Sequence, residues 1–282
     1  MKTGLVMEGG AMRGMYTAGV TDVLMENNVV FDGGVGVSAG AAFGCNYKSH
    51  QIGRTIRYNK KYCTDKRYVS ISSWLKTGNL YGEEFAYSTL PKELDVFDNE
   101  TFKNNKMEFY VVCTNMDTGK PVYHKCYDGG DDDLKWLQAS AALPLAFKPV
   151  NVDGVMLADG GMADSIPLKF MQGLGYEKNV VIMTRHKGYE KKKNSLLPVL
   201  KVVLRKYPNM LKAIENRHIM YNNTLKYIEE QEKEGKVFVF YPSREIEVGV
   251  MEKDANRLEE VYQLGRYDAN ALLDKLKEFM KK

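Results

Sequence analysis

The sequence has little cysteine and histidine and no long apolar run. Its four cysteines form no C-x-x-C pair, and its four histidines do not stand at zinc-binding spacing beside them. We therefore expect reduced, buried thiols and no metal site. No stretch approaches the roughly 18 apolar residues of a membrane span, and the apolar run at the start is too short for a signal peptide. These absences predict a cytoplasmic protein.

Positive charge is concentrated in two segments, although the formal net charge is only +4. Residues 185–217 contain ten lysines and arginines against two acids, and residues 48–67 are also basic. Such clusters attract anionic lipid surfaces, so we expect peripheral contact with the inner face of a membrane. The alternative is a solvated helix face over an apolar core. No recognition motif accompanies the charge, so we expect no nucleic-acid partner, and the oligomeric state stays open.

Short apolar runs alternate with helical patterns along most of the chain. The runs typical of buried strands are residues 5–7, 108–113, 122–126, 179–184 and 237–240. The side chains that fall on one face of the first helix are Tyr16, Val20, Val23 and Leu24. This alternation predicts an α/β fold in which a mainly parallel central sheet carries helices on both faces.

A lysine-rich stretch at residues 191–195 is the candidate boundary between two regions. We expect a catalytic domain over residues 1–190. Residues 191–282 are then a mostly helical C-terminal region packed on that domain, with one further strand near 236–241. The apolar residues among the charges of the last thirty positions are typical of amphipathic helices.

The most informative motif is Gly-Val-Ser-Ala-Gly at residues 36–40. It reads G-x-S-x-G where a short apolar stretch ends and a small-residue helix begins, the layout of a nucleophile elbow that exposes the serine Oγ. The flanking glycines allow the tight turn and the close approach of neighbouring elements. The motif indicates acyl transfer through Ser38, and a Gly/Ala-rich packing turn is the alternative for an isolated match.

A serine nucleophile needs a base, and two candidates follow it in the chain. His186 comes after the 179–184 strand, as in a Ser–acid–His triad, but its neighbours are basic. Asp159 ends a short apolar segment before two glycines, where it can reach the elbow. A carboxylate is a poor base unless it is desolvated or lies against the nucleophile. An ordinary Asp-Gly turn is the alternative interpretation.

A glycine-rich loop, Gly-Gly-Ala-Met-Arg-Gly at residues 9–14, joins the first strand to the first helix. Backbone N–H groups at a helix N-terminus favour negative charge, so the loop can hold a phosphate or the oxyanion of a tetrahedral intermediate. It lacks the ending of a P-loop, and Ala11 stands where a dinucleotide loop has glycine. The acidic residues 128–133 miss the spacing of a calcium loop. We therefore expect neither a cofactor nor a metal.

These three motifs, in this order, resemble the patatin-like phospholipases over roughly residues 4–185. The resemblance implies a three-layer patatin-like fold and a Ser–Asp dyad, in which Ser38 attacks an ester carbonyl and Asp159 takes its proton and later activates water. It implies an enzyme of the phospholipase A or lysophospholipase type that cleaves lipid esters through an acyl-enzyme. The alternative is a catalytically weak or inactive lipid- or phosphate-binding regulator on the same fold.

The resemblance also assigns the residues around the dyad. The implied oxyanion-hole residues are Gly9, Gly10, Ala11 and Met12. The implied supporting residues are Arg13, Gly14, Gly36, Ala39, Gly40, Gly160 and Gly161. Ala11 replaces a family glycine, so we expect a negative φ there, because only then is a methyl group tolerable. The basic, tyrosine-rich stretch 54–68 is the candidate lid.

Overall fold

A central sheet organises the computed structural model, which describes residues 1–281. Its strands follow the order β5-β6-β3-β2-β1-β7-β8, and β4 pairs with β3 at the side of this path. The pairs from β3 through β2, β1 and β7 to β8 are parallel, whereas β4, β5 and β6 join through antiparallel pairs. The predicted mainly parallel sheet is confirmed.

The helices and strands follow one another as the sequence pattern predicts for an α/β chain. In the first half they are β1 (Lys2–Met7), η1 (Ala11–Gly14), α1 (Met15–Glu26), β2 (Gly33–Val37), α2 (Ala39–Lys48), α3 (Arg54–Tyr62), α4 (Ile71–Thr77), the π-helical η2 (Phe85–Leu94), α5 (Asn99–Asn104), β3 (Glu108–Asn115), β4 (Pro121–Cys126) and α6 (Asp131–Ser140). The second half contains β5 (Val150–Val152), β6 (Val155–Asp159), η3 (Gly160–Met162), α7 (Leu168–Gly173), β7 (Tyr176–Ile182), α8 (Leu197–Val203), α9 (Pro208–Lys233), β8 (Val237–Phe240) and α10 (Ala255–Lys281).

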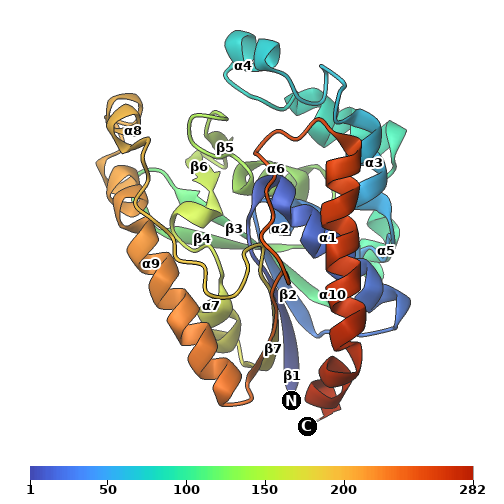
Figure 1. Cartoon of the computed structure of the whole chain (residues 1–282). Helices are drawn as coiled ribbons and strands as arrows, with labels where there is room; N and C mark the ends of the chain where they lie inside the picture. Colours follow the sequence, from blue (N-terminus) through green and yellow to red (C-terminus); the bar gives the residue numbers. More distant parts are fainter. Residues whose placement is uncertain (282) are drawn as a thin grey trace.

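Helices cover both faces of the sheet, which gives three layers. Alternate strand side chains point to opposite faces, so Leu5 and Met7 of β1 enter one core cluster and Val6 enters the other. Helices α1, α2 and α10 lie on the first face, and α7 and α9 lie on the second (Figure 1). The carboxyl ends of the parallel strands therefore meet at one edge, where the loops after β1, β2 and β7 converge.

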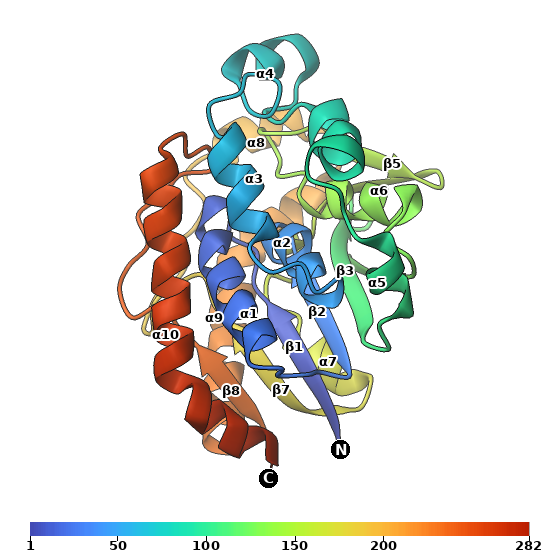
Figure 2. The ribbon, with the colours of Figure 1, turned by 90° about the vertical axis from the view of Figure 1, so that its right-hand side faces the viewer.

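Helix α1 is buried on every side, which differs from the single apolar face that the sequence predicts. Thr17, Thr21 and Asp22 are as inaccessible as its apolar residues. The reason is α10, which lies along α1 and separates it from solvent (Figure 2). The Tyr262 hydroxyl of α10 donates a hydrogen bond of 2.8 Å to the Asp22 carboxylate, which satisfies this polar group inside the interface.

The region after residue 190 shares the sheet and the core of the region before it. Strand β8 pairs in parallel with β7, and its Phe240 belongs to the same core cluster as Leu5 and Met7. Helix α10 adds its own apolar residues to that cluster. A domain boundary at residue 190 stays a prediction.

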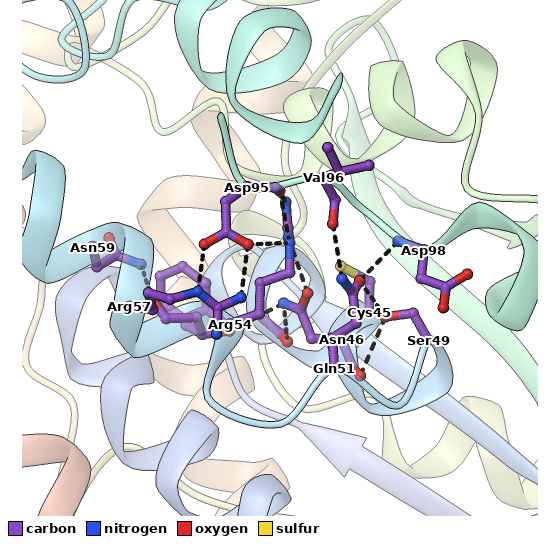
Figure 3. A network of polar contacts seen from close by, with 12 residues as sticks. Cys45, Asn46, Ser49, Gln51, Arg54, Arg57, Asn59, Asp95, Val96 and Asp98 are labelled. Carbon is purple, nitrogen blue, oxygen red and sulfur yellow. Dashed lines mark hydrogen bonds and ion pairs between the residues drawn. The ribbon is translucent and has the colours of Figure 1, made fainter. Parts of the chain in front are cut away.

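The stretch suggested as a lid forms a wall held by buried polar contacts. Arg54, only 5% exposed, donates hydrogen bonds to the Asn46 side chain at 3.0 Å and to the Asp95 carbonyl at 2.5 Å (Figure 3). Arg57 binds the Asp95 carboxylate through two hydrogen bonds of 2.8 Å (Figure 3). The tyrosines of the stretch, Tyr58, Tyr62 and Tyr68, are buried in the core.

Burial also reduces the number of cations that residues 48–67 can present to a membrane surface. Lys48 is buried and donates hydrogen bonds to the backbone carbonyls of Asn105 and Met107. With Arg54 also inside, the exposed cations of this segment are Arg57, Lys60, Lys61, Lys66 and Arg67. No helix within residues 1–281 has the length and the apolar character needed to cross a bilayer.

The contact between α1 and α10 generates the first prediction. A Cβ added at Gly19 would lie 2.1 Å from the Tyr262 carbonyl oxygen, and one added at Gly265 would lie 2.2 Å from the Tyr16 carbonyl oxygen. We expect Gly19→Ala and Gly265→Ala each to lower the free energy of unfolding by about 1–3 kcal/mol, because the helices must move apart. Thermal and urea unfolding measure this loss.

Gly173→Ala is the matched control, since Gly173 ends α7 and an added Cβ there meets no atom within 4 Å. Its stability should equal or exceed that of the unmodified protein. Equal stability of the Gly19, Gly265 and Gly173 variants would contradict the proposed close contact.

Candidate active site

Ser38 stands between β2 and α2 in a conformation that serine rarely adopts. Its φ is +55° and its ψ is −122°, which costs on the order of 1–3 kcal/mol for a residue with a Cβ. The Ser38 N–H donates a 2.8 Å hydrogen bond to Ser140 Oγ, which donates one of 2.6 Å to the Val112 carbonyl. Ser140 is fully buried at the end of α6, so the core holds the turn in place. The sequence pattern had not marked Ser140 as important.

Asp159 is the last residue of β6 and is 4% exposed. Its carboxylate accepts a 2.8 Å hydrogen bond from the Gly161 N–H, and its carbonyl accepts one of 2.8 Å from Thr114 Oγ1. Its N–H donates to the Ala142 carbonyl at 3.0 Å. The side chain is therefore anchored at the sheet edge on which Ser38 also lies.

The electrostatic environment of Asp159 favours a role in proton transfer. Burial raises the pKa of its carboxyl group above the usual value, while the positive charge of Arg217, hydrogen bonding from the Ser38 side chain and the Gly161 N–H act in the opposite direction. A carboxylate with a raised pKa is a stronger base than one in water. Ser38 and Asp159 thus line the same cavity at the carboxyl ends of β2 and β6.

The glycine-rich loop lies directly against the serine. A Cβ added at Gly9 would approach the Val37 carbonyl oxygen to 2.9 Å and Ser38 Cβ to 3.1 Å. Among residues 1–281, the N–H groups of Gly9 and Gly10 donate to no protein acceptor. The N–H of Ala39 begins α2 and has no acceptor within its own helix. Gly9, Gly10 and Ala39 line the cavity beside Ser38. Free N–H groups next to a nucleophile are the kind of donor that stabilises an oxyanion.

The expectation of a negative φ at Ala11 is wrong. Its φ is +48°, in the left-handed region where glycine is favoured, although it carries a methyl group. The following residues form η1, in which the Arg13 N–H donates to the Gly10 carbonyl at 3.1 Å. The tight turn into η1 therefore outweighs the local preference of alanine, and the loop stores strain beside Ser38.

The predicted supporting residues surround this centre. Arg13, Ala39 and Gly161 line the cavity together with the loop residues Gly9, Gly10, Ala11 and Met12. Gly14, Gly36, Gly40 and Gly160 lie behind it at points of close approach. The tightest is Gly160, where a Cβ would lie 2.1 Å from the Val112 carbonyl oxygen, so β6 turns directly over β3.

Glu8 and Arg217 are site residues that the sequence analysis did not identify. The Glu8 carboxylate is buried and accepts hydrogen bonds from the Thr184 N–H at 2.6 Å and the Tyr221 hydroxyl at 2.5 Å. Arg217 Nε donates to the Gly161 carbonyl at 2.5 Å. The position of Glu8 directly after a buried strand could have indicated its role from the sequence. Arg217 lies on α9, far along the chain from the three motifs.

The histidines lie outside this arrangement. Within residues 1–281, neither His186 nor any other histidine is among the residues that line the cavity with Ser38. His124 is stacked on Trp136 with ring centroids 4.3 Å apart, and its Nε2 lies 3.0 Å from the Asp133 carboxylate. The structure brings Ser38 together with Asp159 instead.

One group of residues offers ligand atoms to a metal. Within residues 1–281, donor atoms of His124, Cys126 and Asp133 lie within 4.8 Å of one another. The Asp133 carboxylate, however, already accepts hydrogen bonds from the N–H groups of Tyr127, Asp128 and Gly129 at 2.8–3.0 Å. These contacts explain its position as the anchor of the turn before α6.

A cavity of about 350 Å³ connects the pieces. Ser38, Asp159 and the glycine-rich loop form its base, and aromatic and aliphatic residues of α3, η2 and α6 form one wall. Basic residues from the loop after β7 and from α9 complete the lining. The volume is typical of a site for a small organic ligand, and the lining combines an apolar wall with several charged side chains.

Comparison with known proteins places the chain in a family. The family model described as patatin-like phospholipase matches residues 5–171, and that of a domain of unknown function, DUF6363, matches residues 207–281. The uncharacterized protein YjjU of Escherichia coli is 27% identical over 284 residues, which cover 93% of this chain and 74% of that protein.

Two fungal enzymes match a smaller part. The lysophospholipases nte1 of Aspergillus oryzae and Aspergillus terreus are 26% and 27% identical over 61% of this chain, a match that covers only 11% of their own length. Among solved structures, VipD from Legionella pneumophila aligns with 97% of this chain and 67% of its own, with 13% identity and a TM-score of 0.45. Since the patatin-like phospholipase model spans more than half of the sequence, the chain belongs to the patatin-like phospholipase family.

Proposed function

We propose that the protein is a serine acyl hydrolase that cleaves carboxylic esters of lipids, of the phospholipase A or lysophospholipase type. The observation that carries the proposal is the Ser38–Asp159 pair, with a strained serine and a buried carboxylate beneath free backbone N–H groups in one cavity. Membership of the family supports the lipid ester as substrate.

The geometry supports a two-step reaction. Ser38 Oγ bonds to the ester carbon while its proton passes to the Asp159 carboxylate, and the N–H groups of Gly9, Gly10 and Ala39 stabilise the oxyanion. The tetrahedral intermediate collapses, the ester C–O bond breaks, and Asp159 returns the proton to the leaving alcohol. Water then attacks the acyl-enzyme, gives its proton to Asp159, and releases the fatty acid as Ser38 recovers its hydrogen.

Exposed apolar side chains support contact with a lipid surface. Helix α8 buries Leu197 and Leu200 but leaves Val199 51%, Val202 69% and Val203 57% exposed. Leu75 of α4 is 73% exposed. Both helices lie at the end of the molecule toward which the parallel strands point (Figure 1). Exposed apolar residues with nearby lysines and arginines are typical of helices that lie on anionic membranes.

Replacing either member of the pair tests the catalytic role. Ser38→Ala and Asp159→Asn should each reduce kcat/KM for p-nitrophenyl butyrate by about 10³-fold or more, because nucleophile and base act as a unit. Ser195→Ala, at an exposed position outside the cavity, is the control, and His186→Ala should remain active.

A fluorophosphonate probe separates the enzyme from an inactive lipid-binding regulator. Labelling of the folded protein at Ser38 supports the enzyme. A folded protein that is neither labelled nor active would establish the regulator, and a folded Ser38→Ala variant with full activity would contradict the mechanism.

The environment of Asp159 predicts a pH dependence. The reaction needs the charged carboxylate, so kcat/KM should fall as the pH drops through the folded-state pKa of Asp159, which lies above the usual carboxyl value. Arg217→Met removes a positive charge that lowers this pKa, so the acid limb should move to higher pH. Arg217→Lys should restore part of the shift. An unchanged acid limb in Arg217→Met would show that Arg217 only supports the Gly161 backbone.

The exposed face of α8 predicts vesicle binding. Val199→Glu combined with Val202→Glu should weaken sedimentation with phosphatidylglycerol vesicles about tenfold or more, since charged side chains resist insertion among lipids. Val30→Glu is the control, because Val30 is 74% exposed but precedes β2, at the opposite end of that strand from Ser38. Equal binding of both proteins would exclude α8 as the lipid-contacting surface.

A further inference from the structure

The cavity beside Ser38 carries four cations that lack carboxylate partners. They are Arg13 of η1, Arg185 and Lys191 of the loop after β7, and Arg217 of α9. Within residues 1–281, no carboxylate oxygen lies within 4.0 Å of their charged nitrogen atoms. Arg54, which also lines the cavity, is instead paired with Asp95 at 3.4 Å.

Other basic residues of the same stretch do find acids. Lys187 pairs with Glu232 at 3.5 Å, and Lys201 pairs with Glu215 at 3.1 Å. Other cations of the stretch, such as Lys192 and Lys193, are exposed to solvent and need no acid, whereas the four unpaired cations named above line one cavity. Three of the four, Arg185, Lys191 and Arg217, come from outside the segment that the patatin-like phospholipase model matches.

The cations of the cavity disfavour one another in the absence of an anion. Burial, and then the neighbouring charge of Arg185, lower the pKa of Arg13. Burial, and then the charge of Arg217, lower the pKa of Lys191 to about 7. The Nε atoms of Arg13 and Arg185 are also buried with no hydrogen-bond partner among the described residues. A bound anion would supply both the missing charge and the missing acceptors.

Glu8 forms no ion pair with this group, although it lines the cavity together with Asp159. Its oxygens are occupied by the Thr184 N–H and Oγ1 and by the Tyr221 hydroxyl. These bonds hold its carboxylate against Thr184 and Tyr221. It moderates the repulsion between the cations, because its charge raises the pKa values of Arg13 and Lys191, without forming an ion pair with either.

Aromatic rings and backbone bonds hold the cations in place. The Arg185 guanidinium lies 4.5 Å from the centre of the Tyr189 ring, and Lys191 Nζ lies 4.4 Å from that of Tyr221. The Lys191 backbone exchanges two hydrogen bonds, of 2.9 and 3.0 Å, with the Asn222 side chain on α9. The positive charges are therefore arranged before any ligand arrives, which reduces the entropy lost on binding.

The remaining wall of the cavity is apolar. It includes Leu90 and Pro91 of η2, Leu134 and Leu137 of α6, and Phe147. Helices α3 and α9, which contribute to the two kinds of wall, lie on opposite sides of the molecule with the strand ends between them (Figure 1). A matching ligand has a negative headgroup, an ester and a hydrocarbon chain in that order.

On the basis of the function proposed above, we propose that Arg13, Arg185, Lys191 and Arg217 bind the phosphate of a monoacyl phospholipid whose ester lies at Ser38. The protein is then a lysophospholipase that selects small anionic headgroups, with the C-terminal region supplying that selectivity. Phosphate suits the site because each arginine can donate to two of its oxygens and Lys191 adds a point charge.

The first experiment measures binding without chemistry. In Ser38→Ala protein, inorganic phosphate at millimolar concentration should raise the thermal unfolding midpoint by several degrees. The additional changes Arg185→Met and Lys191→Met should abolish the increase. Lys212→Met, at an exposed position on α9 outside the cavity, should retain it. A phosphate effect that is absent, or equal in all these proteins, would overturn the proposed site whether or not the protein is an esterase.

The second experiment measures selectivity. The ratio of kcat/KM for 1-oleoyl-lysophosphatidate to that for 1-oleoylglycerol should exceed one in the unmodified enzyme and fall about tenfold or more in Arg185→Met and Lys191→Met. Lys212→Met should leave the ratio unchanged. A ratio insensitive to Arg185 and Lys191 would overturn the assignment. Hydrolysis of neither lipid would refute the proposed function, while the phosphate experiment still decides the anion site.

A competition experiment with free phosphate distinguishes a lipid headgroup from a free phosphate regulator as the anion that the site binds. If the cations hold a lipid headgroup, phosphate should compete with lysophosphatidate and leave the hydrolysis of 1-oleoylglycerol nearly unaffected. Equal effects of phosphate on both substrates would mean that the site binds a free phosphate regulator, and would overturn the headgroup assignment.

Discussion

The geometry of the cavity depends on the hydrogen bonds that the buried Glu8 carboxylate accepts. Glu8 follows β1, precedes the glycine-rich loop, and accepts hydrogen bonds from the end of β7 through Thr184 and from α9 through Tyr221. A buried charge is tolerated only when such bonds satisfy it, so the three segments must meet at this point. Because the loop is held from behind, its N–H groups remain free on the side of Ser38. The cations of the cavity occupy positions set by the same meeting of segments.

The sequence predicted those parts of the site that local pattern controls. A G-x-S-x-G motif after an apolar strand and an Asp-Gly-Gly after another predict side chains at strand ends. The parallel pairing of β2 with β3 and the antiparallel pairing of β6 with β3, with Asp159 opposite Cys113, bring these two ends together. The order of the three motifs also indicated the family. Expectations failed where distant packing decides: Ala11 adopts a positive φ because the loop is held from both ends, and α1 is buried all round because α10 covers it. Arg185, Lys191 and Arg217 are visible in the sequence only as part of a basic stretch, since no local pattern shows which cations of the loop after β7 and of α9 face the cavity.

Positive charge serves different purposes in different parts of this molecule. Lys48 and Arg54 are buried and bind backbone carbonyls, so their charge stabilises the wall around α3. Lys187 and Lys201 pair with surface acids, and such exposed pairs add little to stability. The cations in the cavity have no carboxylate partner and repel one another, although Arg217 also donates to the Gly161 carbonyl. A charge count along the sequence cannot separate these cases, because burial and partner geometry determine what each charge does.

The packing of α10 on α1 has a consequence for how the protein is made. Residues 15–26 leave the ribosome early, whereas residues 255–281, which shield them, follow more than two hundred residues later. Until then Asp22 lacks the hydrogen bond from the Tyr262 hydroxyl. Contacts between segments so distant in sequence slow folding. The helical layer that contains α1 is therefore completed only after α10 has been made, whereas every segment that lines the cavity has been synthesised before it.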